Sequence, residues 1–397
     1  MVSETVPEKL WGKEFIIVLS AGIISFSAFG MIAPIFPSFA TGLGATLSVA
    51  GVIAGMIAVV ALVGRPFASI LGDRFNKKYL LAVALTLNGL STILYSFTPN
   101  LIMLVPVRVI HGLMFSVGGA IVLALGVEYI PKNRMGEGIG FLSIGQVIGM
   151  AVGPNAGIFL AGRFSYQVCF LVSGIAIISA GLLICALRYK HVPPLSLDGS
   201  PKTPLRLQNL IAMELLPNAA FVSIFAMGTG LATSFLVIMG NERSIYGVGV
   251  YFFVNAFVVL VTRPYIGRLT DRKSPAFIII PGYVLAAAAM IVIGAAHSLL
   301  ALVIAAVLVA LGTGSALPAF QTDCVQRLGR ARSTVATGTY LIGMDIGMFI
   351  GPMFGGIMAD TFGFCAAFSS VGVLMLLGSG VYVIHKKFLM KKEKILC

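Results

Sequence analysis

Charge is scarce in this chain. Only 10% of its 397 residues are Asp, Glu, Lys or Arg, and 58% are hydrophobic, whereas soluble globular domains carry about 25% charged residues. This composition cannot cover a water-facing surface, so most of the exterior must contact lipid. Backbone that faces lipid must satisfy its own hydrogen bonds, which leaves helices or closed barrels.

Motifs for catalysis and cofactor binding are also missing. The sequence has no P-loop, no nucleophile elbow, no H-E-x-x-H and no cluster of metal ligands. These absences argue against an enzyme and against direct use of ATP, and we expect no cofactor. The five cysteines include no C-x-x-C pair, so we expect neither a disulfide nor a metal site.

Acidic residues are fewer than basic ones, 14 against 27, which gives a formal net charge of +13. The basic residues gather in alternate turns and at both termini, and the opposite turns contain only Arg163 and Arg243 of this kind. The positive-inside rule therefore predicts a multi-pass protein of the cell (inner) membrane with both termini in the cytoplasm. Anionic lipid headgroups account for the basic charge, so we expect membrane lipid and no nucleic acid as a partner.

Long apolar runs make up most of the sequence. Runs of about 20 residues, rather than alternating ten-residue strands, predict transmembrane helices. We expect an all-α integral membrane protein with twelve spans, at residues 15–39, 47–71, 78–97, 101–127, 138–161, 166–187, 219–240, 246–269, 276–296, 299–322, 333–358 and 364–385. Proline and charge between the sixth and seventh spans predict a linker. The expected organisation is an N-terminal six-helix bundle (1–188), a cytoplasmic linker (189–217), and a C-terminal bundle with a basic tail (218–397).

The two halves share one register. Arg65-Pro66 and Asp73-Arg74 recur 198 residues later as Arg263-Pro264 and Asp271-Arg272. A second pattern recurs at the same offset: Gly149, Gly153, Pro154 and Gly157 become Gly347, Gly351, Pro352 and Gly355. Two related bundles that rock around a midplane site are the physical basis of alternating access in transporters. Each half supplies a partner for the other, so we expect a monomer.

Local motifs resemble those of the major facilitator superfamily. Residues 69–78, SILGDRFNKK, resemble its loop signature G-x-L-x-D-R-x-G-[RK]-[RK], with Ser69 and Asn76 in place of the two glycines. Residues 108–112, RVIHG, are similar to the R-x-x-x-G motif of proton-coupled members. Residues 145–157, GQVIGMAVGPNAG, resemble the G-x-x-x-G-P-x-x-G signature of its exporting branches. The resemblance implies two pseudo-symmetric six-helix bundles, a small-molecule substrate, and H+ as the coupling ion of an efflux antiporter.

The loop residues have two interpretations. As gate elements they would close the cytoplasmic mouth in one state and release it in the other, since an aspartate beside a helix N-terminus interacts favourably with the helix dipole. As ordinary charges they would only set topology. The residues concerned are Asp73, Arg74, Lys77, Lys78, Asp271 and Arg272.

The glycines repeat every four residues, so each set forms a stripe along one helix face. Such a stripe lets another helix approach closely, and the proline within it permits a bend. The sequence leaves open whether the stripes seal a contact between the two halves or pack helices in the ordinary way.

Three ionisable residues are expected deep in the spans, where such groups are costly. We interpret Asp345 as a proton carrier, Arg108 as its tuning charge or an anion anchor, and His111 as a second titratable group. The alternatives are a structural ion pair for Asp345 and a packing role for His111. Spacing alone does not show whether the three face one cavity.

Other polar residues are candidates for a cavity or for ion pairs. Arg65 and Arg263 lie in the cytoplasmic halves of their spans, where each faces an inner cavity or pairs with a nearby acid such as Glu128 or Asp323. Gln146, Asn155, Asn255 and Tyr340 are expected at membrane depth and are candidates for lining a substrate cavity.

The leading hypothesis is a secondary active transporter that exports a small organic solute or drug-like compound against proton entry. One alternative is a proton-linked or facilitative importer of a sugar, organic acid or metabolite. Another, of a different class, is a non-transporting membrane receptor or lipid-handling protein built on the same scaffold.

Overall fold

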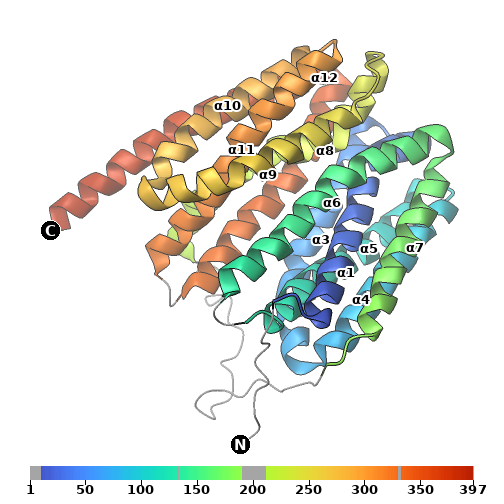
Figure 1. The fold of residues 1–397 in the computed structure, drawn as a ribbon. Coiled ribbons are helices and arrows are strands. Elements are labelled where there is room, and N and C mark those ends of the chain that lie inside the picture. Colours follow the sequence, from blue (N-terminus) through green and yellow to red (C-terminus); the bar gives the residue numbers. More distant parts are fainter. Residues whose placement is uncertain (1–9, 132–133, 190–211, 330–331, 397) are drawn as a thin grey trace, which may run out of the picture. The chain divides into compact units, whose positions relative to one another are not determined.

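The computed structural model describes residues 10–131, 134–189, 212–329 and 332–396, and within these ranges the regular structure is helical (Figure 1). The helices of the first half are α1 (Lys13–Ile32), α2 (Phe36–Gly42), α3 (Leu47–Arg74), α4 (Lys77–Leu94), the 3-10 turn η1 (Tyr95–Phe97), α5 (Leu101–Glu128), α6 (Met135–Arg163) and α7 (Tyr166–Cys185). Those of the second half are η4 (Met213–Leu215), α8 (Leu216–Glu242), α9 (Gly249–Arg272), α10 (Pro275–Ala295), α11 (Leu299–Leu328) and α12 (Ser333–Leu396).

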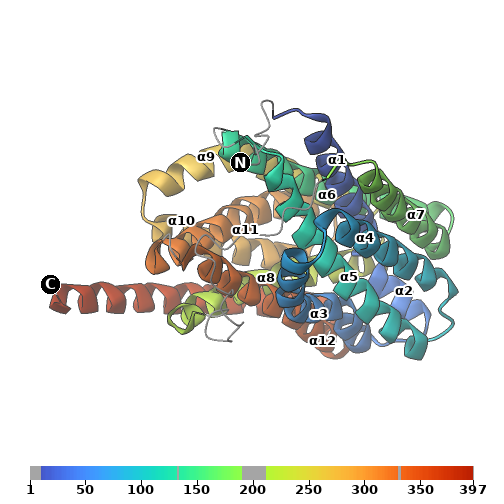
Figure 2. The same cartoon turned by 90° about the horizontal axis from the view of Figure 1, so that it is seen from below.

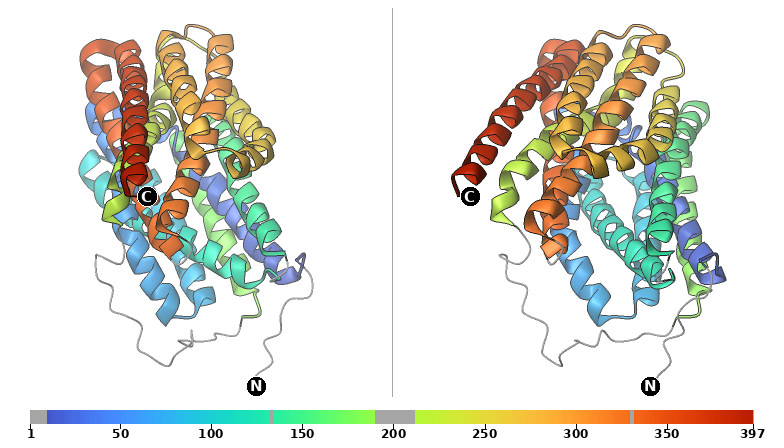
Figure 3. Two further views of the ribbon diagram at one scale, coloured as in Figure 1. Left: turned by 90° about the vertical axis from the view of Figure 1, so that its left-hand side faces the viewer. Right: turned by 60° about the vertical axis from the view of Figure 1, so that its left-hand side comes forward.

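The all-α membrane fold expected from composition is confirmed. In the described residues, ten helical segments are long and apolar enough to cross a bilayer, and Gly249–Arg263 is a shorter apolar helix. The segment Val335–Phe388 has 54 residues, and Gly363 interrupts α12 with φ 80°, a conformation that favours glycine. Figure 3 shows the two arms of α12, orange-red and red, as separate helices. The count of twelve spans stays a prediction.

Helix boundaries repeat at the offset of 198 residues. Helices α4, α5 and α6 begin at Lys77, Leu101 and Met135, and α10, α11 and α12 begin at Pro275, Leu299 and Ser333. The break between α6 and α7 lies at Phe164 and Ser165. The break inside α12 lies at Gly363, again at the fixed offset from Ser165. The caps repeat too: the side chain of Asn100 accepts from the Met103 amide, and that of Ser298 from the Ala301 amide. Side-chain caps satisfy N–H groups that a helix leaves unpaired at its start.

The chain divides into two compact units. Unit 1 comprises residues 1–44 and 59–202, and unit 2 comprises residues 45–58 and 203–397. The first part of α3 therefore belongs to unit 2 by its contacts, although it precedes the linker in sequence. The predicted linker lies mostly at residues 190–211, outside the described part of the chain.

Unit 1 packs α1 against α5, α6 and α7, and α4 against α5 and α7 (Figure 2). Its core consists of aliphatic side chains of α1, α4, α5 and α7, such as Val18, Leu85 and Ile177. The glycine stripe of α6 faces α1: a Cβ on Gly153 would lie 2.4 Å from the Ser27 carbonyl oxygen, and one on Gly157 would lie 2.0 Å from that of Met31. The stripe therefore packs two helices of one unit backbone to backbone.

Unit 2 repeats this arrangement with α12 against α8. A Cβ on Gly347 would lie 2.2 Å from the Ser223 carbonyl oxygen, and one on Gly351 would lie 2.2 Å from that of Met227. Here α10 packs against α11 and α12, and α9 packs against α11. In both units the described contacts of the stripe are helix packing within the unit.

Helix α3 is continuous from Leu47 to Arg74 and contains Pro66. A proline inside a helix cannot donate to the carbonyl four residues earlier, here that of Leu62. This weakened turn follows closely on the division between Ala58 and Val59, where the contacts of α3 change from unit 2 to unit 1.

Candidate functional site

A polar cluster is buried in unit 1 where α4 ends and α5 begins. Arg108 and His111 lie three residues apart on α5 and therefore share a face, and their exposed fractions are 3% and 0%. Tyr95, the first residue of η1, is also fully buried. Three polar side chains thus meet inside a helical bundle, where polar groups are costly unless they are bonded to each other.

Contacts within this cluster are specific. The Tyr95 hydroxyl lies 2.9 Å from Nδ1 of His111 and shares a side-chain hydrogen bond with Arg108. The guanidinium carbon of Arg108 lies 3.6 Å from the ring centre of Phe36, a cation–π geometry that stabilises a cation out of water. Arg108 and His111 stand out in the sequence, whereas Tyr95 and Phe36, which hold them, do not.

Matching donors with acceptors in this cluster favours one form of His111. A guanidinium only donates, so the Tyr95 oxygen accepts from Arg108, and its own hydrogen is donated to Nδ1 of His111. The opposite assignment would leave the buried tyrosine hydrogen without an acceptor. A neutral imidazole that accepts at Nδ1 carries its hydrogen on Nε2. Among the described residues, Nε2 of His111 has no hydrogen-bond partner, so the cluster ends in a buried N–H donor.

A small cavity lies beside the cluster in unit 1. The Phe29 ring contacts His111 edge-on at 6.4 Å and stacks on Phe115 at 4.1 Å. Both phenylalanines line a cavity of about 20 Å³ enclosed by α1, α4, α5 and α7, which is room for one water molecule. Asn88 also lines it, and its Oδ1 atom has no hydrogen-bond partner among the described residues.

Asp345 lies in unit 2 on the first arm of α12 and is 6% exposed. It sits between Gly343 and Gly347, both of which contact the backbone of α8. A carboxylate at this place is strongly disfavoured unless it is bonded or protonated. Because Asp345 and the Arg108–His111 pair belong to different units, their meeting in one charged core stays a prediction.

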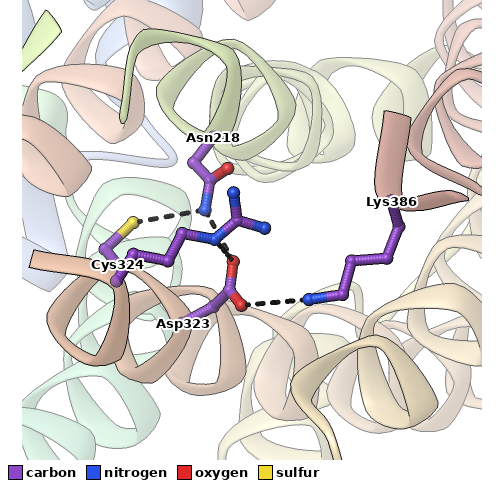
Figure 4. Close-up of polar contacts among 5 residues, drawn as sticks. Asn218, Asp323, Cys324 and Lys386 are labelled. Carbon is purple, nitrogen blue, oxygen red and sulfur yellow. Dashed lines mark hydrogen bonds and ion pairs between the residues drawn. The ribbon is translucent and has the colours of Figure 1, made fainter. Parts of the chain in front are cut away.

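A second buried acid of unit 2 has three donor groups near its carboxylate. Asp323 of α11 is 3% exposed; its oxygens accept from Asn218 Nδ2 at 2.8 Å and Arg327 Nε at 2.8 Å, and Lys386 Nζ lies 3.6 Å away. Figure 4 shows Asn218, Asp323 and Lys386 converging, with the Asn218 amide also 3.7 Å from the Cys324 sulfur. The basic partners seen at Asp323 are thus Arg327 and Lys386. This cluster ties α8, α11 and the second arm of α12 together.

Comparison with known proteins identifies the family. The model of the Major Facilitator Superfamily matches residues 18–342 and 219–394. The chain belongs to this superfamily. The resemblance of its motifs to that family is thereby confirmed, and the chain is a transporter-family protein rather than an enzyme.

Relatives within the superfamily match along their whole length. The multi-drug resistance efflux pump PmrA of Streptococcus pneumoniae is 24% identical over 403 residues, with 97% of this chain and 99% of the relative covered. The multidrug resistance protein MdtG of Escherichia coli is 25% identical, with 92% of each covered. The crystal structure of the POT family transporter PepTSo matches with a TM-score of 0.78 at 10% identity, covering 96% of this chain and 99% of that one, which shows a shared fold.

The superfamily loop between α3 and α4 is partly described. Asn76, which replaces a motif glycine, has φ −61° and caps α4 by accepting from the amides of Lys78 and Tyr79. Lys77 forms an ion pair with Glu128 at the end of α5, and Arg74 is exposed. The side chains of Asp73, Asp271 and Arg272 lie outside the described part of the structure, so the gate hypothesis stays a prediction.

The remaining predicted residues are dispersed. Asn155 donates to the Ala151 carbonyl of its own helix, and Asn255 of α9 donates to the Ala306 carbonyl of α11 at 3.2 Å. Tyr340 is 5% exposed. Arg65 is half-buried and Arg263 is exposed, while the side chain of Gln146 lies outside the description. Of the three residues predicted for one charged core, the described structure places Arg108 and His111 in one cluster of unit 1.

Proposed function

We propose that this superfamily member is a secondary active transporter that exports small drug-like organic compounds, driven by proton entry through alternating access. One observation carries the proposal: two relatives named as multidrug resistance proteins, one of them as an efflux pump, match this chain over at least 92% of its length and of theirs. A match without large unaligned segments supports a shared transport activity for the whole chain, and not only a shared scaffold.

The buried ionisable groups support the proton coupling. Asp345 is a buried carboxylate within an apolar membrane-spanning segment, and a group of this kind takes up and releases protons as its surroundings change. Arg108, held by Tyr95 and Phe36, supplies fixed positive charge in unit 1. In this proposal Asp345 carries the proton, and the Arg108 cluster orients substrate or tunes the carboxylate. The protein lies in the cell membrane with both termini in the cytoplasm, as the distribution of basic turns predicts.

The test begins by finding a ligand. Purified protein is screened for thermal stabilisation by drug-like compounds at two pH values, and flux of the best hit is measured in proteoliposomes with and without an imposed pH gradient. We expect the gradient to drive movement of the hit against its own concentration gradient. Equilibration that ignores the pH gradient would instead indicate a facilitative carrier, and binding without flux would indicate a receptor.

Two matched variants assign the proton carrier. Asp345→Asn should abolish the effect of the pH gradient while downhill movement of the hit continues. Asp323→Asn makes the same chemical change at a buried acid at the end of α11, and it should keep the gradient dependence. If Asp345→Asn responds to the gradient like the unaltered protein, Asp345 is not the carrier.

A further inference from the structure

The first turn of α3 is capped by a residue more than 300 positions away. Asp360, on the first arm of α12, accepts from the Leu47 amide at 3.0 Å, the Ser48 amide at 2.7 Å and the Ser48 hydroxyl at 2.5 Å. The next amide, that of Val49, donates to the Thr46 hydroxyl at 3.3 Å. A helix start needs acceptors for its free amides and favours negative charge. Asp360 supplies both for α3.

Below this cap the two helices touch along their backbones. A Cβ on Gly356 would lie 2.4 Å from the Leu47 carbonyl oxygen, and one on Gly51 would lie 2.1 Å from that of Pro352. Gly55 continues the contact against Phe349, whose carbonyl oxygen would be 3.0 Å away. These residues all belong to unit 2, and Figure 2 shows α3 next to α12. We call this contact the α3–α12 seam.

The seam does not follow from the internal repeat. The position 198 residues before Asp360 is Gly162, and the one 198 residues after Ser48 is Tyr246. Gly356 corresponds to Ile158, which has a bulky side chain where the seam needs none. The repeat-related pair, Gly162 and Tyr246, therefore lacks both the carboxylate and the serine that make this cap, so the repeat does not produce a second copy of it.

The hydrogen bonds of this cap can be exchanged for hydrogen bonds to water. Asp360 is exposed, so its hydrogen bonds with α3 can be replaced by hydrogen bonds to solvent at small net cost. The three glycines place no side chain of their own in the contact, so fewer side chains interlock across the seam. In the described structure α3 is the helix whose contacts are divided between the two units. Alternating access requires contacts of this kind to be exchanged.

We propose that Asp360 is a positioning residue for transport, which holds residues 45–58 of α3 on α12 in one state and releases them in the other. The inference rests on the proposed transport function, but the opening of the seam can be measured without a substrate.

The test uses the accessibility of a buried α3 position next to the seam glycine Gly51. Ala50, which is 0% exposed, is changed to cysteine in a background carrying Cys185→Ser, Cys365→Ser and Cys397→Ser. The rate at which a water-soluble maleimide labels Ala50→Cys then reports how often the seam opens. We expect Asp360→Asn to raise this rate about tenfold, since charge-assisted hydrogen bonds are lost, and Asp360→Glu to restore most of the protection. Ser48→Ala removes one donor and leaves the two amides, so a smaller increase is expected.

Equal labelling rates in all four proteins would overturn the proposal. If Asp360→Asn does not fold, the comparison of Ser48→Ala with the unaltered seam is the test.

The link to transport is tested by joining the two sides of the seam with a disulfide. In the same background without Ala50→Cys, the pair Ser48→Cys and Asp360→Cys is oxidised in proteoliposomes, which should stop flux of the screened hit, and a reductant should restore it. Full flux after complete cross-linking would refute the release step. If no hit is transported by any variant, the proposed function fails. The labelling rates need no substrate, so they still test whether Asp360 holds the seam closed.

Discussion

The two copies of the repeat agree where they build the bundle and differ where they place polar chemistry. Glycine stripes, helix starts and caps recur after 198 residues. Apart from the repeated arginine and loop residues, the polar residues singled out in the structure do not: Asp345 corresponds to Val147, Arg108 to Ala306, His111 to Val309, Tyr95 to Ile293, Asp323 to Leu125 and Asp360 to Gly162. The shared positions maintain close helix packing, which both bundles need. The unshared positions distinguish the bundles and are therefore the better candidates for function.

The largest loss of stability is expected from changing a glycine that both copies share. Gly153→Ala places a methyl group 2.4 Å from the Ser27 carbonyl oxygen. Since backbone must move to accept it, we expect a loss of about 3 kcal/mol, the upper part of the range for overpacking. Thermal unfolding in detergent measures this. Gly162→Ala in the same helix is the control, because a Cβ there meets nothing within 4 Å. Equal stability of the two variants would mean that the stripe does not set the packing.

A smaller effect is expected from an unshared charge. Asp323→Asn keeps the shape of the side chain but removes the anion that Arg327 and Lys386 approach. Hydrogen bonds to charged groups contribute about 1.5–3 kcal/mol, so the melting temperature should fall clearly. Glu137→Gln is the control, because its pair with Arg134 is exposed and such pairs contribute about 0–1 kcal/mol. Similar losses in both variants would contradict the buried-cluster account.

The smallest loss of stability is expected from removing one hydroxyl in the polar cluster of unit 1. Tyr95→Phe keeps the ring but removes the hydroxyl that joins Arg108 to His111, and we expect a loss of about 1 kcal/mol together with altered transport of the screened hit. Tyr283→Phe removes a buried hydroxyl that donates to the Phe221 carbonyl oxygen and should leave transport unchanged. If both substitutions change transport equally, the Tyr95 cluster has no special part in it.

Much of the fold could be predicted from the sequence because packing in lipid depends on local patterns. Apolar runs predicted the helices, and the fixed offset of 198 residues aligned their starts. The glycine spacing indicated a close contact, but it could not show that Gly153 faces α1, since a stripe carries no information about its partner.

The candidate site was predictable only in part. Arg108 and His111 stood out as rare ionisable residues in an apolar run. Phe36 is one of 27 phenylalanines and Tyr95 one of 11 tyrosines, so no local pattern could select the two that hold the cluster. Asp360 gave no signal either, because its partner Ser48 is 312 residues away and only the tertiary structure brings them together.

Helix α3 has the properties of a lever with its own flexible joint. Its 28 residues correspond to a rod of about 42 Å, and the missing hydrogen bond of Pro66 makes the turn from Leu62 to Pro66 the easiest place to bend. A tilt of the end held by Asp360 would therefore be absorbed at this joint or passed on to the motif loop at the other end. The stiffness of this turn therefore sets how far a movement of α3 at one face of the membrane displaces the loop at the other face.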